Sequence, residues 1–300
     1  MMGFWLWALQ KAGFLRLVVW TIAGTLGVQA FFGTMERFPN ASLGDIEARI
    51  DLIRRASIED LRSPRFVGHL MLAVGMNDDV PEEAPRFCLE HAGGLKVYQY
   101  PNQFSQYLVL LSRHRIRSYL EIGCRWGGTF VLTTEYLKRF GAVRKSVAVD
   151  IHRSPVKDYY MSFNPRAEFM QVDSKKKRFW EYLRRHRFDL IFIDGDHGYH
   201  GVRNDFMAAQ NSTDMFVFHD ISSVACPSVT KFWEEFKLRA RGAFTFHEFT
   251  DQYSEVFSRT GGTFMGIGVA IRRRGCRFHE LCYPTLLRDS KGYMWRRLLQ

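Results

Sequence analysis

The sequence predicts an α/β protein with a doubly wound parallel sheet that is covered by helices on both faces. Two observations carry this prediction. From residue 118 onward, short apolar runs alternate with helical stretches, and acidic residues stand at the ends of the apolar runs. The apolar runs are 118–123, 146–152, 167–173, 188–196 and 215–221, and helical stretches between them are 129–140, 177–186 and 202–210. Alternation of this kind builds right-handed crossovers and therefore a parallel sheet.

The residues before this alternation are predicted to be mainly helical. Within 43–118, one helix carries isoleucines on a single face over residues 46–53. A second helix is expected over residues 103–114, where apolar side chains again recur at helical spacing. The acidic, proline-containing stretch 76–85 is expected to form a loop.

The composition is that of a folded chain. The 300 residues are 46% hydrophobic and 15% aromatic, which excludes a disordered protein. A chain of this length buries a core without the help of disulfide bonds. The five cysteines are odd in number and include no C-x-x-C pair, so a disulfide framework and a structural zinc site are both disfavoured. Cys124 and Cys226 stand in apolar contexts and are expected to be buried thiols.

The net charge of +11 is concentrated in two segments. Residues 175–187 carry seven basic side chains and one acidic side chain, and residues 272–300 carry eight basic and two acidic side chains. Two such patches suggest an anionic surface or ligand nearby. A solvated helix face followed by a basic tail is an equally simple interpretation. Because neither interpretation requires nucleic acid, we expect no nucleic-acid partner.

Residues 17–35 form an uncharged segment of 19 residues, about the minimum length for a helix that crosses a bilayer. Three interpretations stay open. The segment is a signal-anchor that follows Lys11 and Arg16, a signal peptide with a V-Q-A cleavage pattern at 28–30, or an amphipathic helix. We therefore expect membrane association through residues 17–35, as a single-pass signal-anchor, or a location in the secretory pathway.

Acidic side chains stand at the ends of five predicted strands. In a doubly wound sheet, ligands bind at the carboxyl ends of the strands, which lie at one edge. The sequence therefore predicts one crevice that is lined by Glu121, Asp150, Asp173, Asp194, Asp196 and Asp220.

The turn after the first predicted strand reads E-I-G-C-R-W-G-G, from Glu121 to Gly128. Gly123, directly after the strand, permits a tight turn and a close approach of the backbone to a ligand. A dinucleotide fingerprint would need glycine in place of Arg125, so binding of a pyrophosphate is disfavoured. Asp150 follows Gly128 by 22 residues, where an acid can accept hydrogen bonds from two ribose hydroxyls. An ordinary strand-to-helix turn is the alternative.

Two groups of motifs resemble those of a known enzyme family. The stretches E-I-G-C-R-W-G-G-T-F and V-A-V-D-I-H are similar to motifs I and II of class I S-adenosylmethionine-dependent methyltransferases. The stretches F-I-D-G-D-H-G-Y-H-G-V-R-N-D-F, F-V-F-H-D-I and P-S-V-T-K-F-W-E-E are more specific. They resemble the family that includes cephalosporin-hydroxylase-type proteins and macrocin O-methyltransferase-like enzymes. The resemblance covers about residues 99–272.

The resemblance implies a Rossmann-like fold, a seven-stranded sheet and S-adenosylmethionine as the cofactor. The last strand, from Phe264 to Arg272, would run antiparallel to the others. Asp150 would lie at the ribose of the cofactor and Asp173 at its adenine. The cofactor-binding residues that the resemblance implies are Glu121, Gly123, Trp126, Gly127, Asp150, Asp173 and Asp194. The expected parts of the chain are a hydrophobic anchor or signal segment (1–35), a helical cap region (36–98), the methyltransferase domain (99–272) and a basic tail (273–300).

A hydroxyl acceptor is a poor nucleophile until its proton is removed or a metal polarises it. The D-G-D-H turn and the later H-D pair bring candidate groups to two strand ends. Because histidine is suited to general base catalysis near neutral pH, we predict Asp196, His197 and His219 as the catalytic residues. Asp205, in V-R-N-D-F, is expected to be an exposed or capping acid of the following helix.

Carboxylates from two strand ends also suit a hard cation such as Mg²⁺. In the sugar and antibiotic O-methyltransferases that the chain resembles, a metal is held by the first acid of this turn and by an acidic pair at the next strand. Asp194 and Asp220 match this pattern, whereas His219 stands in place of the other acid of the pair. The predicted metal ligands are therefore Asp194, His219 and Asp220. A weaker site, a softer ion, or a metal-free site with His219 as the base stay open as alternatives.

The predicted function is O-methylation of a hydroxyl on a sugar or small molecule, with a small-molecule or glycan acceptor as the partner. A cofactor-binding relic or membrane-tethered scaffold without catalysis is the alternative. A nucleic-acid methyltransferase is disfavoured, because an N-P-P-F loop is missing and Asn164-Pro165 is followed by Arg166.

Overall fold

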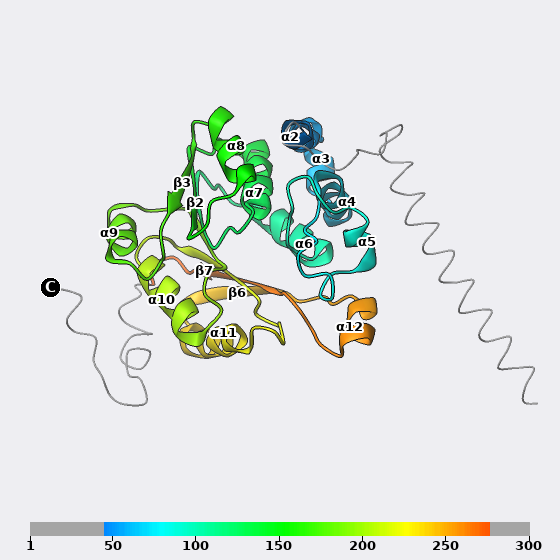
Figure 1. The fold of residues 1–300 in the computed structure, drawn as a ribbon. Coiled ribbons are helices and arrows are strands. Elements are labelled where there is room, and N and C mark those ends of the chain that lie inside the picture. Colours follow the sequence, from blue (N-terminus) through cyan, green and yellow to red (C-terminus); the bar gives the residue numbers. More distant parts are fainter. Residues whose placement is uncertain (1–44, 277–300) are drawn as a thin grey trace, which may run out of the picture. The chain divides into compact units, whose positions relative to one another are not determined.

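The computed structural model describes residues 45–276, whose centre is a seven-stranded sheet in the order β3-β2-β1-β4-β5-β7-β6 (Figure 1). β7 pairs antiparallel with β5 and β6, and all other neighbouring strands pair in parallel. This confirms the predicted Rossmann-like sheet with an antiparallel last strand. The strands are β1 (Ser118–Ile122), β2 (Lys145–Asp150), β3 (Ala167–Gln171), β4 (Leu190–Ile193), β5 (Met215–His219), β6 (Phe244–Phe249) and β7 (Ile267–Arg272).

The central strands are apolar along their whole length because helices cover both faces of the sheet. Every residue of β4 and of β5 is buried. Along β1, Tyr119 packs into the hydrophobic core on one face and Leu120 into the core on the other. The first face is covered by α7 (Gly128–Phe140) and α8 (Pro155–Phe163), and the second by α9 (Lys177–Arg185), α10 (Tyr199–Ala209) and α11 (Pro227–Ala240) (Figure 1).

The helices before the sheet pack on its first face, beside α7 (Figure 1). Ile50 and Phe104 belong to the same hydrophobic core as Val217 of β5, so the described part of the expected cap region shares its core with the sheet. Glu135 of α7 accepts a hydrogen bond from Arg54 of α2 (3.0 Å), which links α2 to α7, and another from Lys138 within α7 (2.6 Å). They are α2 (Asp45–Arg55), α3 (Ile58–Leu61), α4 (Pro64–Val74), α5 (Arg86–Leu89) and α6 (Pro101–Leu111).

Residues 75–98, which we call the wall segment, connect α4 to α6 and fold back on themselves. Gly75 has a φ of +106°, and its carbonyl accepts a hydrogen bond from the amide of Val97 (2.9 Å). The amide of Met76 donates to the carbonyl of His91 (2.8 Å). The segment lies directly on the start of α7, because a Cβ at Gly128 would overlap the carbonyl of Leu95.

Four elements after residue 118 were not predicted: α8, α11, β6 and α12 (Ser254–Thr260). The last strand was predicted to begin at Phe264 but begins at Ile267. The physical reason is that Met265 and Gly266 have φ angles of +61° and +100°, which interrupt an extended strand. Helix α9 buries Phe179 and Leu183, while its basic side chains are exposed.

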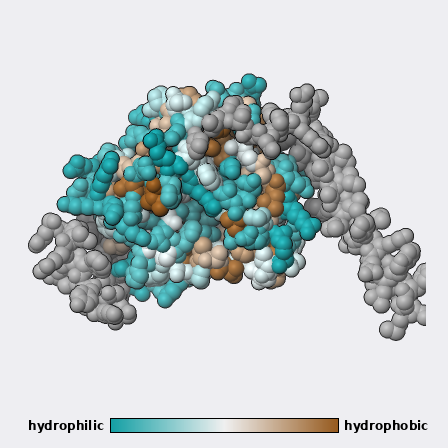
Figure 2. Space-filling model, viewed as in Figure 1, coloured by the Kyte–Doolittle hydropathy of each residue, from teal (hydrophilic) through white to brown (hydrophobic). Residues whose placement is uncertain are grey.

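The surface seen in Figure 2 is mostly hydrophilic, with small separate hydrophobic patches. Within residues 45–276, the helices are too short or too polar to span a bilayer. The predicted membrane or signal segment at 17–35 lies outside the described residues, as does the tail from residue 277 onward.

Candidate functional site

A cleft of about 720 Å³ lies at the carboxyl ends of the central strands. Its size is in the range of sites for small molecules. The predicted site residues line it, with the exception of Gly127. Those that line it are Glu121, Gly123, Trp126, Asp150, Asp173, Asp194, Asp196, His197, His219 and Asp220.

The glycine turn after β1 needs glycine at two positions. Gly123 has a φ of +84°, and a Cβ there would overlap the carbonyl oxygen of Asp194. Gly127 has a φ of +95° and caps α7, and a Cβ there would overlap the side chain of Lys157. Side chains are disfavoured at these φ values. Gly127 therefore allows the turn to form without lining the cleft, whereas Gly123 borders the cleft.

Asp150 ends β2, and its carboxylate is held in place by the turn. Oδ2 accepts a hydrogen bond from the amide of Arg125 (2.6 Å), and Oδ1 accepts one from the amide of His152 (2.8 Å). The buried ammonium of Lys157 lies 4.0 Å from Oδ2. Each carboxylate oxygen has a second lone pair, so Asp150 can still accept hydrogen bonds from hydroxyls in the cleft.

Glu121, near the end of β1, is a buried acid. The hydroxyl of Tyr119 donates a hydrogen bond to its carboxylate. Burial raises the pKa of Glu121 to about 8, because removal from water disfavours the charged form. Its carboxyl group is therefore mostly protonated at neutral pH.

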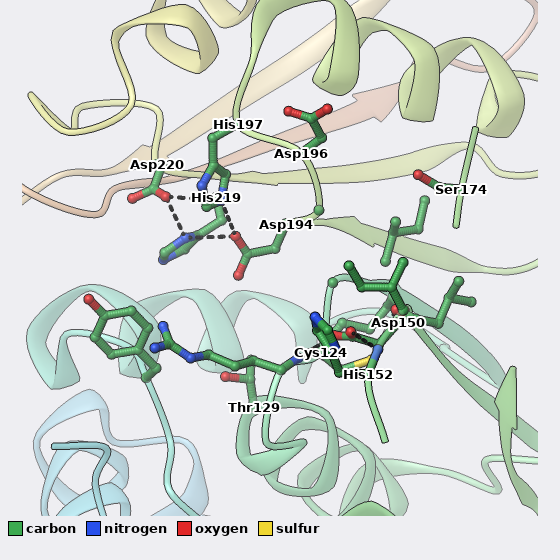
Figure 3. A pocket seen from close by; sticks show the side chains of 18 of the residues that line it. Cys124, Thr129, Asp150, His152, Ser174, Asp194, Asp196, His197, His219 and Asp220 are labelled. Atoms are coloured by element: carbon green, nitrogen blue, oxygen red, sulfur yellow. Dashed lines mark hydrogen bonds and ion pairs between the residues drawn. The ribbon is translucent and has the colours of Figure 1, made fainter. Parts of the chain in front are cut away.

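Asp173 and Asp196 each accept a hydrogen bond from a backbone amide of their own loop. Oδ1 of Asp173 accepts a hydrogen bond from the amide of Lys175 (2.9 Å). Asp196 forms an ion pair with Lys175 and accepts a hydrogen bond from the amide of Gly198 (2.8 Å), and the bond from Lys175 lowers its pKa. Figure 3 shows that Asp196 points away from Asp194. The structure therefore does not bring Asp196 together with the two histidines that were predicted with it.

Four side chains converge at the ends of β4 and β5, and we call Asp194, His197, His219 and Asp220 the His–Asp cluster (Figure 3). Nδ1 of His219 lies 3.1 Å from Oδ1 of Asp194 and 3.4 Å from Oδ2 of Asp220. Nε2 of His197 lies 3.2 Å and 3.4 Å from the same two oxygens. The His197 side chain is 45% exposed and that of His219 is 3% exposed, so only His197 is open to a molecule in the cleft.

The charges of the cluster support one another. Burial alone would raise the pKa of Asp220, but His219 reverses this and holds it at about 2. Burial would likewise raise the pKa of Asp194, and the two histidines hold it below its usual value. The hydrogen bond with Asp194 raises the pKa of His197 to about 11. The pKa of His219 is raised as well, because the two carboxylates outweigh its burial.

The cluster also fits a metal ion. One ligand atom from each of Asp194, His219 and Asp220 lies within 4.8 Å of the others, and His197, Asp220 and Cys226 form a second such group. Neither ring nitrogen of the buried His219 has a partner in hydrogen-bond geometry, although Nδ1 is close to both carboxylates. A buried nitrogen without a directed hydrogen bond, beside two carboxylates, is suited to a cation. Cys226 is buried as predicted, but it borders this cluster, with Sγ 3.3 Å from Oδ2 of Asp220.

The expectation for Asp205 was wrong. Asp205 is neither exposed nor a helix cap, because it lies within α10 and is completely buried. Its carboxylate lies behind Gly195, and burial raises its pKa to about 6. The V-R-N-D-F pattern does not reveal which face of α10 packs on the D-G-D-H turn.

Several residues of the cleft were missed by sequence reasoning. Glu83, Lys96 and Tyr98 come from the wall segment. Ser223 comes from the loop after β5, and Met265 from the residues before β7. These residues follow no regular spacing. An acidic pair at 82–83 within a loop was the one signal that the sequence offered.

The chain is similar to known proteins in sequence and in fold. Residues 120–221 match a family model described as a methyltransferase domain. A search of curated proteins found no match. An O-methyltransferase from Bacillus cereus in complex with SAH is 16% identical, with a TM-score of 0.42, over 75% of this chain and 99% of that chain.

Two further solved structures are similar. The O-methyltransferase TomG from Streptomyces achromogenes, involved in tomaymycin synthesis and in complex with SAM, is 14% identical over 72% of this chain and 99% of that chain, with a TM-score of 0.45. The MycE methyltransferase of the mycinamycin biosynthetic pathway, in complex with Mg and SAH, is 16% identical over 68% of this chain and 58% of that chain, with a TM-score of 0.41.

The segment that matches the methyltransferase model runs from β1 to the residue after Asp220. It contains the glycine turn, Asp150 and the whole His–Asp cluster. Residues 120–221 are therefore similar to a methyltransferase domain, in agreement with the resemblance that the motifs indicated.

Proposed function

We propose that the protein methylates a hydroxyl group of a sugar or another small molecule, with S-adenosylmethionine as the methyl donor and a divalent cation at the His–Asp cluster. One observation carries this proposal. A single cleft holds the glycine turn and Asp150, which suit the donor, and also the His–Asp cluster, which suits activation of a hydroxyl.

The residues of the turn fit the donor. Gly123 allows the turn to pack directly against the backbone of Asp194, and the first residues of α7 border the cleft beside it. The start of a helix attracts a carboxylate. Asp150 is suited to bind the ribose hydroxyls, and Asp173 lies at the next strand end, where the adenine is expected. Bound there, S-adenosylmethionine supplies an electrophilic methyl carbon.

His197 is the best candidate for the base that accepts the proton of the acceptor hydroxyl. Its raised pKa keeps the ring protonated between the two carboxylates, so this role requires a cation whose charge would lower that pKa. Its ring is held by Asp194 and Asp220 and remains open to the cleft, whereas His219 is buried. We therefore assign His219 to holding the cluster, and Asp196 to holding the turn through Lys175. The Asp194, His219 and Asp220 side chains would hold the cation. Its positive charge would balance the two carboxylates in place of a protonated His197.

The ligand set is relevant to the choice of metal. Mg²⁺ prefers oxygen ligands, whereas imidazole suits softer ions. With one or two imidazoles and the thiol of Cys226 near the carboxylates, we propose that Mn²⁺ or Zn²⁺ binds more tightly than Mg²⁺.

Calorimetry of the full chain tests the proposal. S-adenosylmethionine is titrated into wild-type protein and into Asp150→Asn, with and without Mn²⁺. We expect micromolar binding that Asp150→Asn weakens and that Asp158→Asn leaves unchanged, because Asp158 is an exposed acid paired with Arg153. Methyl transfer to any hydroxyl acceptor would exclude the non-catalytic alternative. A folded protein that does not bind the donor would contradict the proposal.

A further inference from the structure

One wall of the cleft is built outside the segment that matches the methyltransferase model. Glu83 and Tyr98 belong to this wall and border the same cleft as Asp220. Burial raises the pKa of Glu83, and the negative charge of Asp220 raises it further. Glu83 therefore lines the same cleft as the group of side chains that would activate the acceptor.

The position of Glu83 is fixed from several directions. The hydroxyl of Tyr98 donates a hydrogen bond to its Oε2 (2.9 Å), and the hydroxyl of Tyr100 donates to its backbone carbonyl (2.6 Å). Arg259 donates to the carbonyls of the residues on either side, at 3.0 and 2.7 Å. A surface loop has to lose conformational entropy to be held in this way. Such a fixed carboxylate is suited to bind one group of a ligand in a defined place.

The charge of this end of the cleft limits what it can bind. Lys96 lies 3.4 Å from Asp78, and Arg125 lies 3.2 Å from Asp79, so each of these two cations is paired with an acid of the wall segment. The histidines of the His–Asp cluster, or a cation bound there, balance its two carboxylates, so the carboxylate of Glu83 is the added negative charge. A phosphorylated or carboxylated acceptor would be repelled, whereas a neutral molecule with hydroxyl donors would be attracted.

We infer that Glu83 binds a second hydroxyl of the acceptor, next to the hydroxyl that is methylated at the His–Asp cluster. The acceptor is then a neutral molecule with neighbouring hydroxyl groups, such as a glycoside. This inference rests on the proposed function. Tyr98 donates its hydrogen bond to Oε2 of Glu83. Within residues 45–276 no donor bonds to Oε1, so the lone pairs of Oε1 remain available to a ligand. Glu83 is thus an acceptor-binding residue that does not touch the reacting methyl group.

The test measures methyl transfer by the full chain, with Mn²⁺, to methyl hexopyranosides, their monodeoxy analogues and hexose 6-phosphates. We expect Glu83→Gln to raise KM for the glycoside about tenfold or more, because a hydrogen bond to a charged group is lost, with kcat changed less than about threefold. The analogue that lacks the neighbouring hydroxyl should have the same KM in both proteins. Tyr98→Phe, which releases the carboxylate, should give a smaller rise in KM.

Glu82→Gln is the matched control, because Glu82 is the exposed neighbour of Glu83 and its side chain lies outside the cleft. It should leave both constants unchanged. Donor binding by calorimetry should be the same in all variants, which separates this inference from the proposed function. Three outcomes would overturn the inference: an unchanged KM in Glu83→Gln, a preference for hexose phosphates, or no transfer to any glycoside by protein that binds the donor.

Discussion

Nδ1 of His219 lies 3.1 Å from Oδ1 of Asp194, and this contact joins the ends of the paired strands β5 and β4. Neither side chain is held there by its own strand alone. Asp194 follows the last residue of β4, and His219 ends β5, so the sheet register brings them together. The positions of Asp194 and His219 in the cluster therefore depend on the core of the sheet.

The first prediction concerns the metal. Asp220 has a φ of +59°, which asparagine tolerates better than most residues, so Asp220→Asn should remain folded. We expect its affinity for Mn²⁺ to fall at least about tenfold, because a charged ligand becomes neutral. Electron paramagnetic resonance of free Mn²⁺ measures this loss. Asp196→Asn should retain the metal, and equal affinities in wild type and Asp220→Asn would refute the assignment.

The second prediction concerns the base. His197→Gln should lower kcat by about 100-fold or more, since general base catalysis is worth about that much, while donor binding is retained. The defect should shrink when the acceptor hydroxyl is more acidic, because such a group needs less help to lose its proton. Rates with a series of substituted phenols provide the measurement. A defect that is the same for all acceptors would mean that His197 acts in another way.

The third prediction concerns Glu121, whose pKa is raised to about 8 by burial. The donor brings a positively charged amine and sulfonium into the cleft, which should favour the ionised carboxylate. Binding should therefore release a proton near pH 7 and become tighter as the pH rises from about 6.5 to 8.5. Calorimetry in buffers with different ionisation enthalpies counts the proton. In Glu121→Gln the released proton should disappear, and an unchanged count would exclude Glu121 as its source.

The fourth prediction concerns the link between α2 and α7. Burial would raise the pKa of Glu135, but Lys138, Tyr160 and Arg54 reverse this and lower it. An acid whose pKa is lowered by folding stabilises the protein above its unfolded pKa, near 4.3, and loses this effect as the pH falls. Glu135→Gln should therefore lower the free energy of unfolding by about 1–3 kcal/mol at pH 7, and by less at acidic pH.

Urea denaturation of both proteins at several pH values measures this difference. Asp51→Asn is the control, because its ion pairs with Arg54 and Arg55 are exposed and should contribute less than about 1 kcal/mol. A difference between wild type and Glu135→Gln that does not depend on pH would argue against the charge of Glu135 as the cause.

The sheet could be predicted from the sequence because its central strands are buried on both faces. An apolar run such as Leu190–Ile193 has few other uses in a folded chain, and the acids that follow such runs meet at one edge for geometric reasons. The edge strand β6 was missed although its buried Phe244 and exposed Thr245 begin the alternation that is typical of a half-buried strand. Its role depends on pairing with β7, which no local pattern reveals.

The parts of the site that were not predicted depend on contacts between distant segments. Asp205 is buried because the face of α10 that carries it packs toward Gly195. Helical spacing alone does not determine which face of a helix packs inward. Glu83 is held by Arg259, more than 170 residues away in the sequence. Asp196 was expected beside His197 because the two are adjacent, but Lys175 of another loop draws its carboxylate away.

The wall segment has a consequence for how far a relationship to other methyltransferases extends. Residues 120–221 contain the turn, Asp150 and the His–Asp cluster, whereas Glu83 and Tyr98 precede this stretch and Arg259, which holds the loop around Glu83, follows it. With the roles proposed above, donor binding and acceptor choice would be encoded in separate stretches of the gene. A relative that shares only the middle stretch would inherit the donor half of the cleft, and its acceptor could diverge without any change in the reaction.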